Sequence, residues 1–382
     1  MQIESKLPRV GTTIFTVMSR LAEQTGALNL GQGFPDFEPP ALFAAALQRH
    51  VKAGKNQYAP MAGVPRLQQQ IGKKLARDYG ASIEPETCIT VTDGATEGLF
   101  DTITAVVRPG DEVIVFDPCY DSYEPAVLLQ GARAVHLPLT AEYRIDFERL
   151  ASAIGPRTRL IVLNFPHNPS GAVLEPGDLE TLAQLVRDTS VFLLSDEVYE
   201  HIVYDGRQHQ SLLRSSELRE RSFVVGSFGK AYHATGWKVG WVVAPAALTV
   251  ELRKVHQFVT FSTSNAPQHA FADVLEQEPE LLRELPKFYQ EKRDRFRRLL
   301  APSLFRLLPV AGTYFQLADY SALSRDPDLE FARRLAVEVG VAVIPVSPFY
   351  ERQPEQHIIR FCFAKNDSTL DHAAARLCEL TP

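Results

Sequence analysis

The chain has 382 residues, of which 45% are hydrophobic and 23% are charged. This length allows two domains or one large α/β unit with an appendage, and the hydrophobic share is ordinary for a globular protein. The formal net charge of -6, without any basic tract, argues against a nucleic-acid partner. The start of the chain lacks the apolar core of a signal peptide, and no later stretch reaches transmembrane length, so we expect no membrane partner.

The cysteine pattern indicates the cellular compartment in which we expect the protein. Cys88, Cys119, Cys362 and Cys378 are scattered without a CxxC pair. Cys88 and Cys362 lie in apolar runs that are typical of strands, which favours buried thiols over a metal site. A reducing, cytoplasmic setting is therefore expected.

The predicted elements fall into three stretches. The first 45 or so residues are rich in Pro and Gly and show little periodicity after Leu21, which predicts an irregular N-terminal arm. Short apolar runs with helices between several of them then predict a mostly parallel sheet that is buried on both faces. These runs cover residues 88–92, 112–116, 159–165, 191–196, 222–227 and 240–244.

The alternation of predicted strands and helices changes near residue 280. Residues 281–300 read as one long, charged amphipathic helix. Strands are expected near 312–317 and 357–363, with helices around 330–339 and 369–380, which together predict a smaller α+β domain. The predicted organisation is an arm at 1–45 that joins the small domain, a large domain at 46–279 and a small domain at 280–382.

Three polar side chains follow buried strands at their carboxyl ends, where parallel sheets bind ligands. They are Asn164, Asp196 and Lys230. The amine of Lys230 can form a Schiff base with an aldehyde, and the carboxylate of Asp196 can pair with a pyridine nitrogen. These are the two parts that a protein supplies to pyridoxal phosphate. The alternatives are a solvated surface lysine and an aspartate that caps a helix.

A phosphate site is predicted at the turn from strand to helix at residues 93–96. Gly94, Ala95 and Thr96 allow backbone N–H groups to approach an anion at a helix N-terminus. An ordinary connection between strand and helix would look the same. Asp93 is unexpected beside a phosphate, so its side chain should point away or cap the helix.

Other residues complete the candidate site. Tyr120 can stack on a flat ring, although Tyr123 competes for this role and either can be a core tyrosine. Asn168 lies in an Asn-Pro turn, where simple turn chemistry is the alternative. Arg360 stands inside an apolar strand, where a buried guanidinium needs either a substrate carboxylate or an internal salt bridge.

Taken in order, these motifs resemble the class I/II aminotransferases, which are pyridoxal phosphate enzymes of fold type I. Within that family the motif sequences are most similar to those of methionine aminotransferases and of the K-type kynurenine and glutamine aminotransferases. The similarity runs the whole length of the chain, through NLGQGFPDF, NQYAPMAGVP, TDGATEG, FDPCYDSYEP, LNFPHNPSG, SDEVYEH, GSFGKAYHATGWKVGW, RKVHQFVTFS, GTYF and IRFCFAK.

The resemblance implies an α/β fold with a mostly parallel seven-stranded sheet, amino-acid and 2-oxo-acid substrates, and a homodimer in which Tyr58 reaches into the partner's site. For the cofactor it implies covalent attachment to Lys230, contacts from Asp196, Asn164, Tyr199 and Tyr120 to the ring, and a phosphate site of Gly94, Ala95, Thr96, Ser227 and Lys238. For the substrate it implies a carboxylate site of Arg360, Asn168 and the backbone of Gly33, and a side-chain pocket of Phe15, Phe261 and Tyr58.

The implied reaction is transfer of an amino group from an apolar, aromatic or sulfur-containing amino acid, by a double-displacement mechanism. Two alternatives stay open at this point. A β-lyase that cleaves C–S bonds needs the same lysine and acid, and the motifs cannot separate it from a transaminase. A pyridoxal-phosphate-binding regulator would carry an added DNA-binding module, for which the sequence shows neither a segment nor a basic patch.

Overall fold

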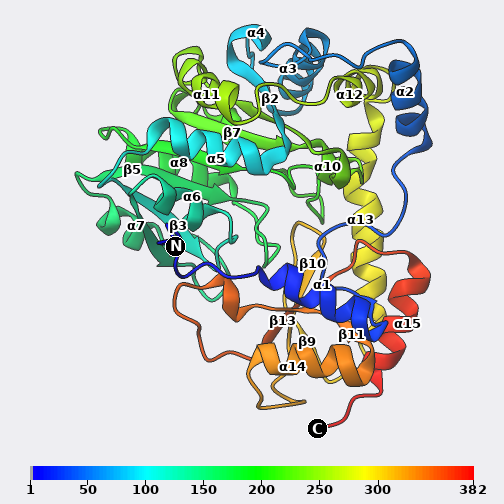
Figure 1. The fold of residues 1–382 in the computed structure, drawn as a ribbon. Helices are drawn as coiled ribbons and strands as arrows, with labels where there is room; N and C mark the ends of the chain where they lie inside the picture. The colour runs from blue at the N-terminus through cyan, green and yellow to red at the C-terminus, as the bar shows by residue number, and fades with distance from the viewer. Residues whose placement is uncertain (1–2) are drawn as a thin grey trace.

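The computed structural model describes residues 3–382 and contains two main sheets (Figure 1). The larger sheet lies in the upper part of the view and the smaller one in the lower part. The long helix α13 (Glu280–Leu299) runs alongside both parts. The site described below lies between the two parts.

The larger sheet has seven strands in the order β2-β8-β7-β6-β5-β3-β4. All neighbouring strands pair in parallel except β8, which is antiparallel to both β2 and β7. The predicted mostly parallel sheet is therefore confirmed. Its strands are β2 (Ile89–Asp93), β3 (Glu112–Asp117), β4 (Arg133–Pro138), β5 (Thr158–Asn164), β6 (Phe192–Asp196), β7 (Ser222–Ser227) and β8 (Val239–Val243).

The continuous apolar runs produce a sheet that is buried on both faces. Successive side chains of a strand point to opposite faces. In β3, Val113 and Val115 therefore join one hydrophobic cluster, whereas Ile114 joins the other. Strand β4 has no such run, because it lies at the sheet edge and is only partly buried. That is why the sequence did not reveal it.

Helices cover both faces of this sheet (Figure 1). Helix α5 follows β2 directly, and its first residue, Gly94, has a φ of 73° that an L side chain rarely adopts. The helices of this part are α2 (Ala41–Lys52), α3 (Pro65–Tyr79), α4 (Pro85–Cys88), α5 (Gly94–Val106), α6 (Tyr123–Leu129), α7 (Phe147–Ala153), α8 (Pro176–Val186), α9 (Ser216–Arg219), α10 (Phe228–Ala231), α11 (Ala246–Val259) and α12 (Asn265–Gln277), with 3-10 turns at Leu212–Arg214 and Thr235–Trp237.

The smaller sheet has four antiparallel strands in the order β12-β13-β10-β9. It packs with α13 and the C-terminal helices around a separate cluster of buried residues. The predicted α+β character of this part is confirmed. Its elements are β9 (Arg306–Leu307), β10 (Phe315–Asp319), α14 (Asp328–Arg334), a π turn (Leu335–Val339), β11 (Val341–Ala342), β12 (Ile344–Pro345), a 3-10 turn (Ser347–Phe349), β13 (Ile358–Cys362) and α15 (Asp367–Cys378).

The prediction of an irregular N-terminal arm is wrong for one stretch. Residues Ile14–Thr25 form helix α1, which begins at the side-chain cap of Thr13 and ends at Gly26 in the left-handed conformation. The short strand β1 (Leu28–Asn29) then pairs in parallel with β11 of the small part. Helix α1 packs against the small part (Figure 1), where Met18 and Ala22 are buried.

Helix α2 crosses the predicted boundary at residues 45–46. It packs against α12, and the ring of Phe43 lies 5.0 Å from that of Phe271. The whole helix thus contacts the part that contains the larger sheet.

The remaining expectations concern the membrane and the cysteines. No helix among residues 3–382 is long and apolar enough to cross a membrane. The four cysteines are free, and Cys362 is buried in β13 as predicted. Cys88 differs from the prediction, because it ends helix α4 and is only partly buried.

Candidate active site

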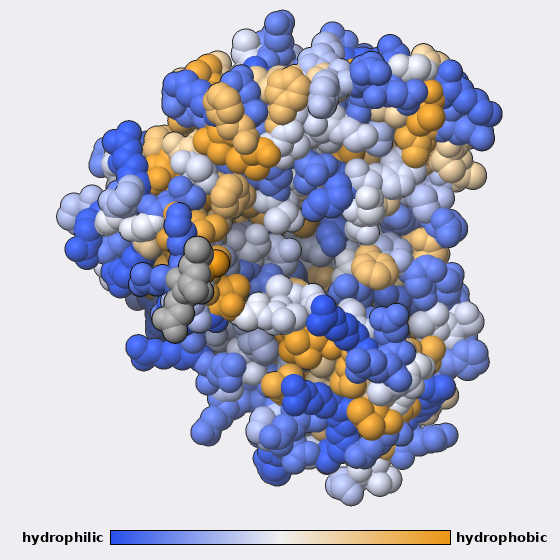
Figure 2. Space-filling view, in the orientation of Figure 1, coloured by the Kyte–Doolittle hydropathy of each residue, from blue (hydrophilic) through white to orange (hydrophobic). Residues whose placement is uncertain are grey.

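A cavity of about 280 Å³ lies at the carboxyl ends of β5, β6 and β7, facing the small part. The surface is hollowed in this region, between α10 and β10 (Figure 2). Most of the residues that the sequence singled out line this one cavity, although they come from stretches far apart in the chain. They are Phe15, Gly33, Gly94, Ala95, Thr96, Tyr120, Asn164, Asn168, Asp196, Tyr199, Ser227, Lys230, Lys238 and Arg360.

Lys230 extends its amine into the middle of the cavity. It lies in α10, a single helical turn directly after β7. Its Nζ donates a hydrogen bond to the carbonyl oxygen of Gly33 at 2.9 Å. Burial of the amine lowers the pKa of Lys230 from 10.5 to about 8. Near neutral pH the neutral, nucleophilic form of this lysine is therefore more populated than that of an ordinary lysine.

Asp196 is the last residue of β6, and its carboxylate is buried. It accepts hydrogen bonds from the hydroxyl of Tyr123 at 2.7 Å and from the backbone N–H of Val198 at 3.3 Å. Burial raises the pKa of Asp196 to about 6, against the opposing effect of these bonds. A cationic partner in the cavity would favour its charged form.

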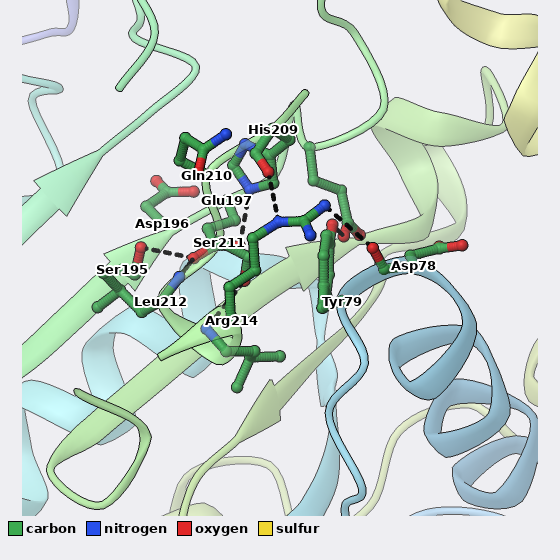
Figure 3. Close-up of polar contacts among 12 residues, drawn as sticks. Asp78, Tyr79, Ser195, Asp196, Glu197, His209, Gln210, Ser211, Leu212 and Arg214 are labelled. Carbon is green, nitrogen blue, oxygen red and sulfur yellow. Dashed lines mark hydrogen bonds and ion pairs between the residues drawn. The ribbon is translucent and has the colours of Figure 1, made fainter. Parts of the chain in front are cut away.

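The neighbours of Asp196 fix the end of β6. Glu197 accepts hydrogen bonds from Ser195 Oγ at 2.9 Å, from His209 Nε2 at 2.8 Å and from the backbone N–H of Leu212 at 3.1 Å. Figure 3 shows this buried network beside Asp196, continued by Arg214 to the carbonyl oxygens of His209 and Asp78. The network anchors the strand end from which Asp196 projects.

The amide side chains of Asn164 and Asn168 form one arrangement at the end of β5. Asn164 donates to the carbonyl oxygen of Asp196 at 3.3 Å and accepts the backbone N–H of Asn168 at 3.0 Å. The Phe165–Pro166 and Asn168–Pro169 peptide bonds are both cis. Tyr199 lies on the opposite side, and its ring centroid is 5.7 Å from Lys230 Nζ.

The predicted phosphate turn forms one end of the cavity. A Cβ atom on Gly94 would lie only 3.2 Å from Lys238 Nζ, so the lysine amine closely approaches the start of α5. Ser227, at the end of β7, also lines this end. Asp93 does not line the cavity, and its side chain makes no capping hydrogen bond. Of the two placements expected for Asp93, the structure therefore shows the side chain that points away from the phosphate site, not the helix cap.

The opposite end contains Arg360, which is 0% exposed in β13. Its Nη1 donates to Asn168 Oδ1 at 2.6 Å and its Nη2 to the carbonyl oxygen of Gly31 at 2.9 Å, whereas its buried Nε has no partner. Burial lowers the pKa of Arg360 to about 10. Among residues 3–382 this arginine forms no ion pair with a carboxylate, so the predicted alternative of an internal salt bridge does not hold.

The two tyrosines of the DPCYDSYEP segment separate into different positions. Tyr120 lines the cavity, whereas the hydroxyl of Tyr123 is committed to Asp196. The rings meet edge to face at 5.6 Å. Of the two tyrosines, Tyr120 is thus the one whose side chain lines the cavity.

Tyr58 and Phe261 do not line this cavity. Their side chains lie on the surface, 82% and 47% exposed, with ring centroids 5.3 Å apart. Several residues that line the cavity were missed by sequence reasoning, because apolar and small residues carry no chemical signal. They are Gln32, Phe34, Leu99, Val198, Gly229, Thr235, Val239 and Phe315.

Comparison with known proteins identifies the family. The model of the aminotransferase class I and II family matches residues 25–377. The methionine aminotransferase of Escherichia coli is 50% identical over 378 residues, which cover 99% of this chain and 98% of that protein. The chain belongs to the class I and II aminotransferases.

Two further similarities support this membership. Kynurenine–oxoglutarate transaminase 1 of Rattus norvegicus is 34% identical to this aminotransferase, over 97% of this chain and 96% of that protein. A solved structure of an Escherichia coli protein with a reported methionine aminotransferase function superposes with a TM-score of 0.97, at 50% identity and with full coverage of both chains. The enzyme is therefore a transaminase of fold type I that depends on pyridoxal phosphate.

The cavity of this aminotransferase fits that cofactor. A buried amine with a lowered pKa, a buried carboxylate at a strand end and a helix N-terminus with a nearby lysine suit its aldehyde, its ring nitrogen and its phosphate, respectively. The buried and unpartnered Nε of Arg360 leaves one donor for a further anion. A substrate carboxylate is such an anion.

Proposed function

We propose that this aminotransferase takes its amino group from an apolar, aromatic or sulfur-containing L-amino acid, with methionine-like donors favoured. The group passes to a 2-oxo acid in two successive half-reactions. The observation that carries the proposal is Arg360. A fully buried guanidinium whose protein contacts are neutral oxygens needs an anion, and its planar fork suits a carboxylate.

Arg360 and Asn168 hold the α-carboxylate of the donor, next to the backbone of Gly33. This placement directs the donor's Cα toward Lys230, because Lys230 Nζ contacts the Gly33 carbonyl at 2.9 Å. When bound, pyridoxal phosphate supplies an aldehyde carbon that bonds to amines and a pyridine ring that accepts electron density from Cα.

Lys230 acts as the general base and then as the general acid. Its Nζ removes the proton from the donor's Cα and later returns a proton in the course of the transfer. A pKa of about 8, caused by burial, suits both directions near neutral pH. Asp196 holds the ring nitrogen in its protonated form, and Tyr123 keeps that carboxylate oriented.

The remaining contacts position the ring and the phosphate. Tyr120 stacks on the ring, and Asn164 and Tyr199 contact its oxygen. The phosphate is held by the first N–H groups of α5 and by polar side chains around it. The residues of this phosphate site are Gly94, Ala95, Thr96, Ser227 and Lys238.

The donor preference follows from the cavity lining. Its basic residues are Lys230, Lys238 and Arg360, and each already has a role. A second carboxylate, as in aspartate, would therefore be buried without a cationic partner. Aromatic rings such as Phe15 and Phe315 offer apolar surface instead, which suits methionine and phenylalanine. The similarity to the methionine aminotransferase of Escherichia coli points to the same class of donor.

The test is a half-reaction followed by absorbance. The holoenzyme is mixed with L-methionine, L-phenylalanine or L-aspartate in the absence of any 2-oxo acid. Methionine should abolish the visible band of the bound cofactor and release a 2-oxo acid at least ~100-fold faster than aspartate does. Arg360→Lys keeps the positive charge but loses the planar guanidinium fork. This variant should slow the half-reaction with methionine by roughly 100-fold. The exposed Arg352→Lys is the matched control.

A cysteine conjugate separates the alternative of a β-lyase. In this experiment the cysteine conjugate is the only substrate, and no oxo-acid acceptor is added. Release of pyruvate and ammonia from the conjugate as fast as methionine is turned over would contradict the assignment as a transaminase. A visible band that no amino acid changes would contradict both activities.

We further propose a cytoplasmic homodimer in which Tyr58 and Phe261 complete the partner's site. The exposure of both aromatic rings on one surface supports an interface there. Phe258, which is 82% exposed at the end of α11, extends the same surface. Hydrophobic residues gather over α11 in Figure 2.

A further inference from the structure

A cluster of buried charged groups lies next to the phosphate turn, outside the cavity. Glu97 and Asp101 are four residues apart on α5 and share one face of it, and His256 meets them from α11. His256 and Asp101 are 0% exposed. None of these residues lines the cavity, and the roles described above do not use them.

Both ring nitrogens of His256 face hydrogen-bond acceptors. Nε2 lies 2.9 Å from the carbonyl oxygen of Met61, and Nδ1 lies 2.8 Å from Glu97 Oε1 and 3.5 Å from Asp101 Oδ2. A carbonyl and an ionised carboxylate cannot donate. Each ring nitrogen must therefore carry a proton, and His256 is an imidazolium.

The electrostatics agree with this protonation. Burial lowers the pKa of His256, but its contacts with the carboxylates of Asp101 and Glu97 outweigh burial and raise the pKa to about 9. Burial raises the pKa of Asp101 to about 6. Burial also acts to raise the pKa of Glu97, but the hydrogen bonds that Glu97 accepts, chiefly from His256, outweigh it and lower the pKa of Glu97 below its ordinary value. Because Nδ1 of His256 uses its proton to donate to Glu97, it has no lone pair with which to bind a metal ion.

The cluster connects directly to the phosphate turn. Glu97 uses its other oxygen, Oε2, to accept the backbone N–H of Asp93, the residue before Gly94. The contacts thus form one chain, from the Met61 carbonyl through His256 and Glu97 to the backbone at the start of α5. The backbone of His256 also accepts the N–H of Phe261 at 3.0 Å.

We propose that the imidazolium of His256 is a positioning residue for the phosphate of the cofactor. Through Glu97 it fixes the backbone at Asp93 and Gly94, so that the N–H groups of α5 point at the phosphate. It also offsets the carboxylates of Glu97, Asp101 and Asp93, which would otherwise repel a dianion held on the same turn. This inference rests on the proposed assignment of Gly94, Ala95 and Thr96 to the phosphate.

The experiment compares pyridoxal phosphate with pyridoxal, which lacks the phosphate. Both are titrated into the full chain freed of cofactor, for the wild type and for His256→Gln. The variant should bind pyridoxal phosphate at least ~10-fold more weakly, equivalent to ~1.4 kcal/mol, and pyridoxal with unchanged affinity. His269→Gln is the matched control, because His269 lies partly exposed on α12 and stacks on His50.

Glu97→Gln provides a second variant if His256→Gln does not fold. It keeps the side-chain volume and an acceptor for His256, but its amide nitrogen cannot accept the Asp93 N–H. It should show the same loss, confined to the phosphate-bearing ligand. Equal weakening of both ligands would mean a merely structural role and would overturn the inference. A wild type that binds both ligands equally would instead contradict the phosphate assignment itself.

Discussion

Burial acts on two basic residues of this site with different outcomes. It lowers the pKa of Lys230 to about 8 and that of Arg360 to about 10. Lys230 can therefore lose its proton near neutral pH, whereas Arg360 stays charged. The same physical cause thus yields a nucleophile at one position and a permanent anion-binding group at the other.

The lowered pKa of Lys230 predicts how capture of the cofactor depends on pH. Only the neutral amine attacks the aldehyde, so the rate should rise with pH and level off above about 8, whereas an ordinary lysine continues to gain reactivity up to 10.5. The measurement is the rate at which the visible band appears when pyridoxal phosphate is added to the cofactor-free chain. Lys230→Ala gives the background from surface amines. An inflection at 10 or above would show that the amine is not desolvated.

Close packing of α5 against β8 positions the phosphate turn. A Cβ atom at Gly240 of β8 would lie 2.7 Å from the backbone nitrogen of Ala95. A Cβ atom at Gly98, one turn further along α5, would lie 2.6 Å from the side chain of Val242. Glycine at these positions allows the helix to approach the strand until its N-terminus reaches the cavity.

Gly240→Ala should therefore affect both stability and cofactor binding. The added methyl group meets backbone rather than a flexible side chain, so we expect a loss of about 1–3 kcal/mol in the free energy of unfolding. The turn should also shift and weaken the binding of pyridoxal phosphate. Urea unfolding and a cofactor titration measure the two effects.

Gly177→Ala on α8 is the control for this packing argument, because a Cβ atom there meets open space. It should change neither quantity by more than a few tenths of a kcal/mol. Wild-type behaviour of Gly240→Ala would mean that α5 can move away from β8 without consequence for the phosphate site.

At the scale of the whole molecule, the cavity exists only because distant segments meet. Gly33 comes from the N-terminal segment, Asp196 from the larger sheet, Lys230 from helix α10 that follows β7 of that sheet, and Arg360 from the smaller sheet. Tyr58 and Phe261 are exposed and do not line this cavity, which is why we propose that they act on a second copy of the chain.

Mixed dimers test this arrangement. Lys230→Ala chains lack the nucleophile, and Tyr58→Ala chains lack the aromatic group offered to the partner. In a mixed dimer one site has both changes and the other has neither. Co-expression of the two variants should therefore recover up to about a quarter of the wild-type activity, more than either variant alone. No recovery in isolated mixed dimers would place Tyr58 outside the partner's site.

The sequence by itself determined the class of fold and most of the site. Apolar runs bounded by turns marked six of the seven strands, and polar residues at their carboxyl ends marked Asn164, Asp196 and Lys230. These predictions succeeded because buried parallel strands and strand-end chemistry are local features of the chain. The edge strand β4 was missed because it is only partly buried and lacks an apolar run. Helix α1 was missed although Thr13 and Gly26 mark its two ends, because the Pro and Gly content of the segment was given more weight than these caps.

Only the tertiary structure decided which partners the polar groups have. Tyr123 binds Asp196 across 73 positions, His256 binds Glu97 across 159, and Arg360 binds Asn168 across 192. A hydrogen bond or an ion pair depends on distance in space and on burial, and no periodicity in the chain encodes either. For that reason the sequence could name the arginine and the lysine, whereas only the fold buried the guanidinium of Arg360 and lowered the pKa of Lys230 to about 8.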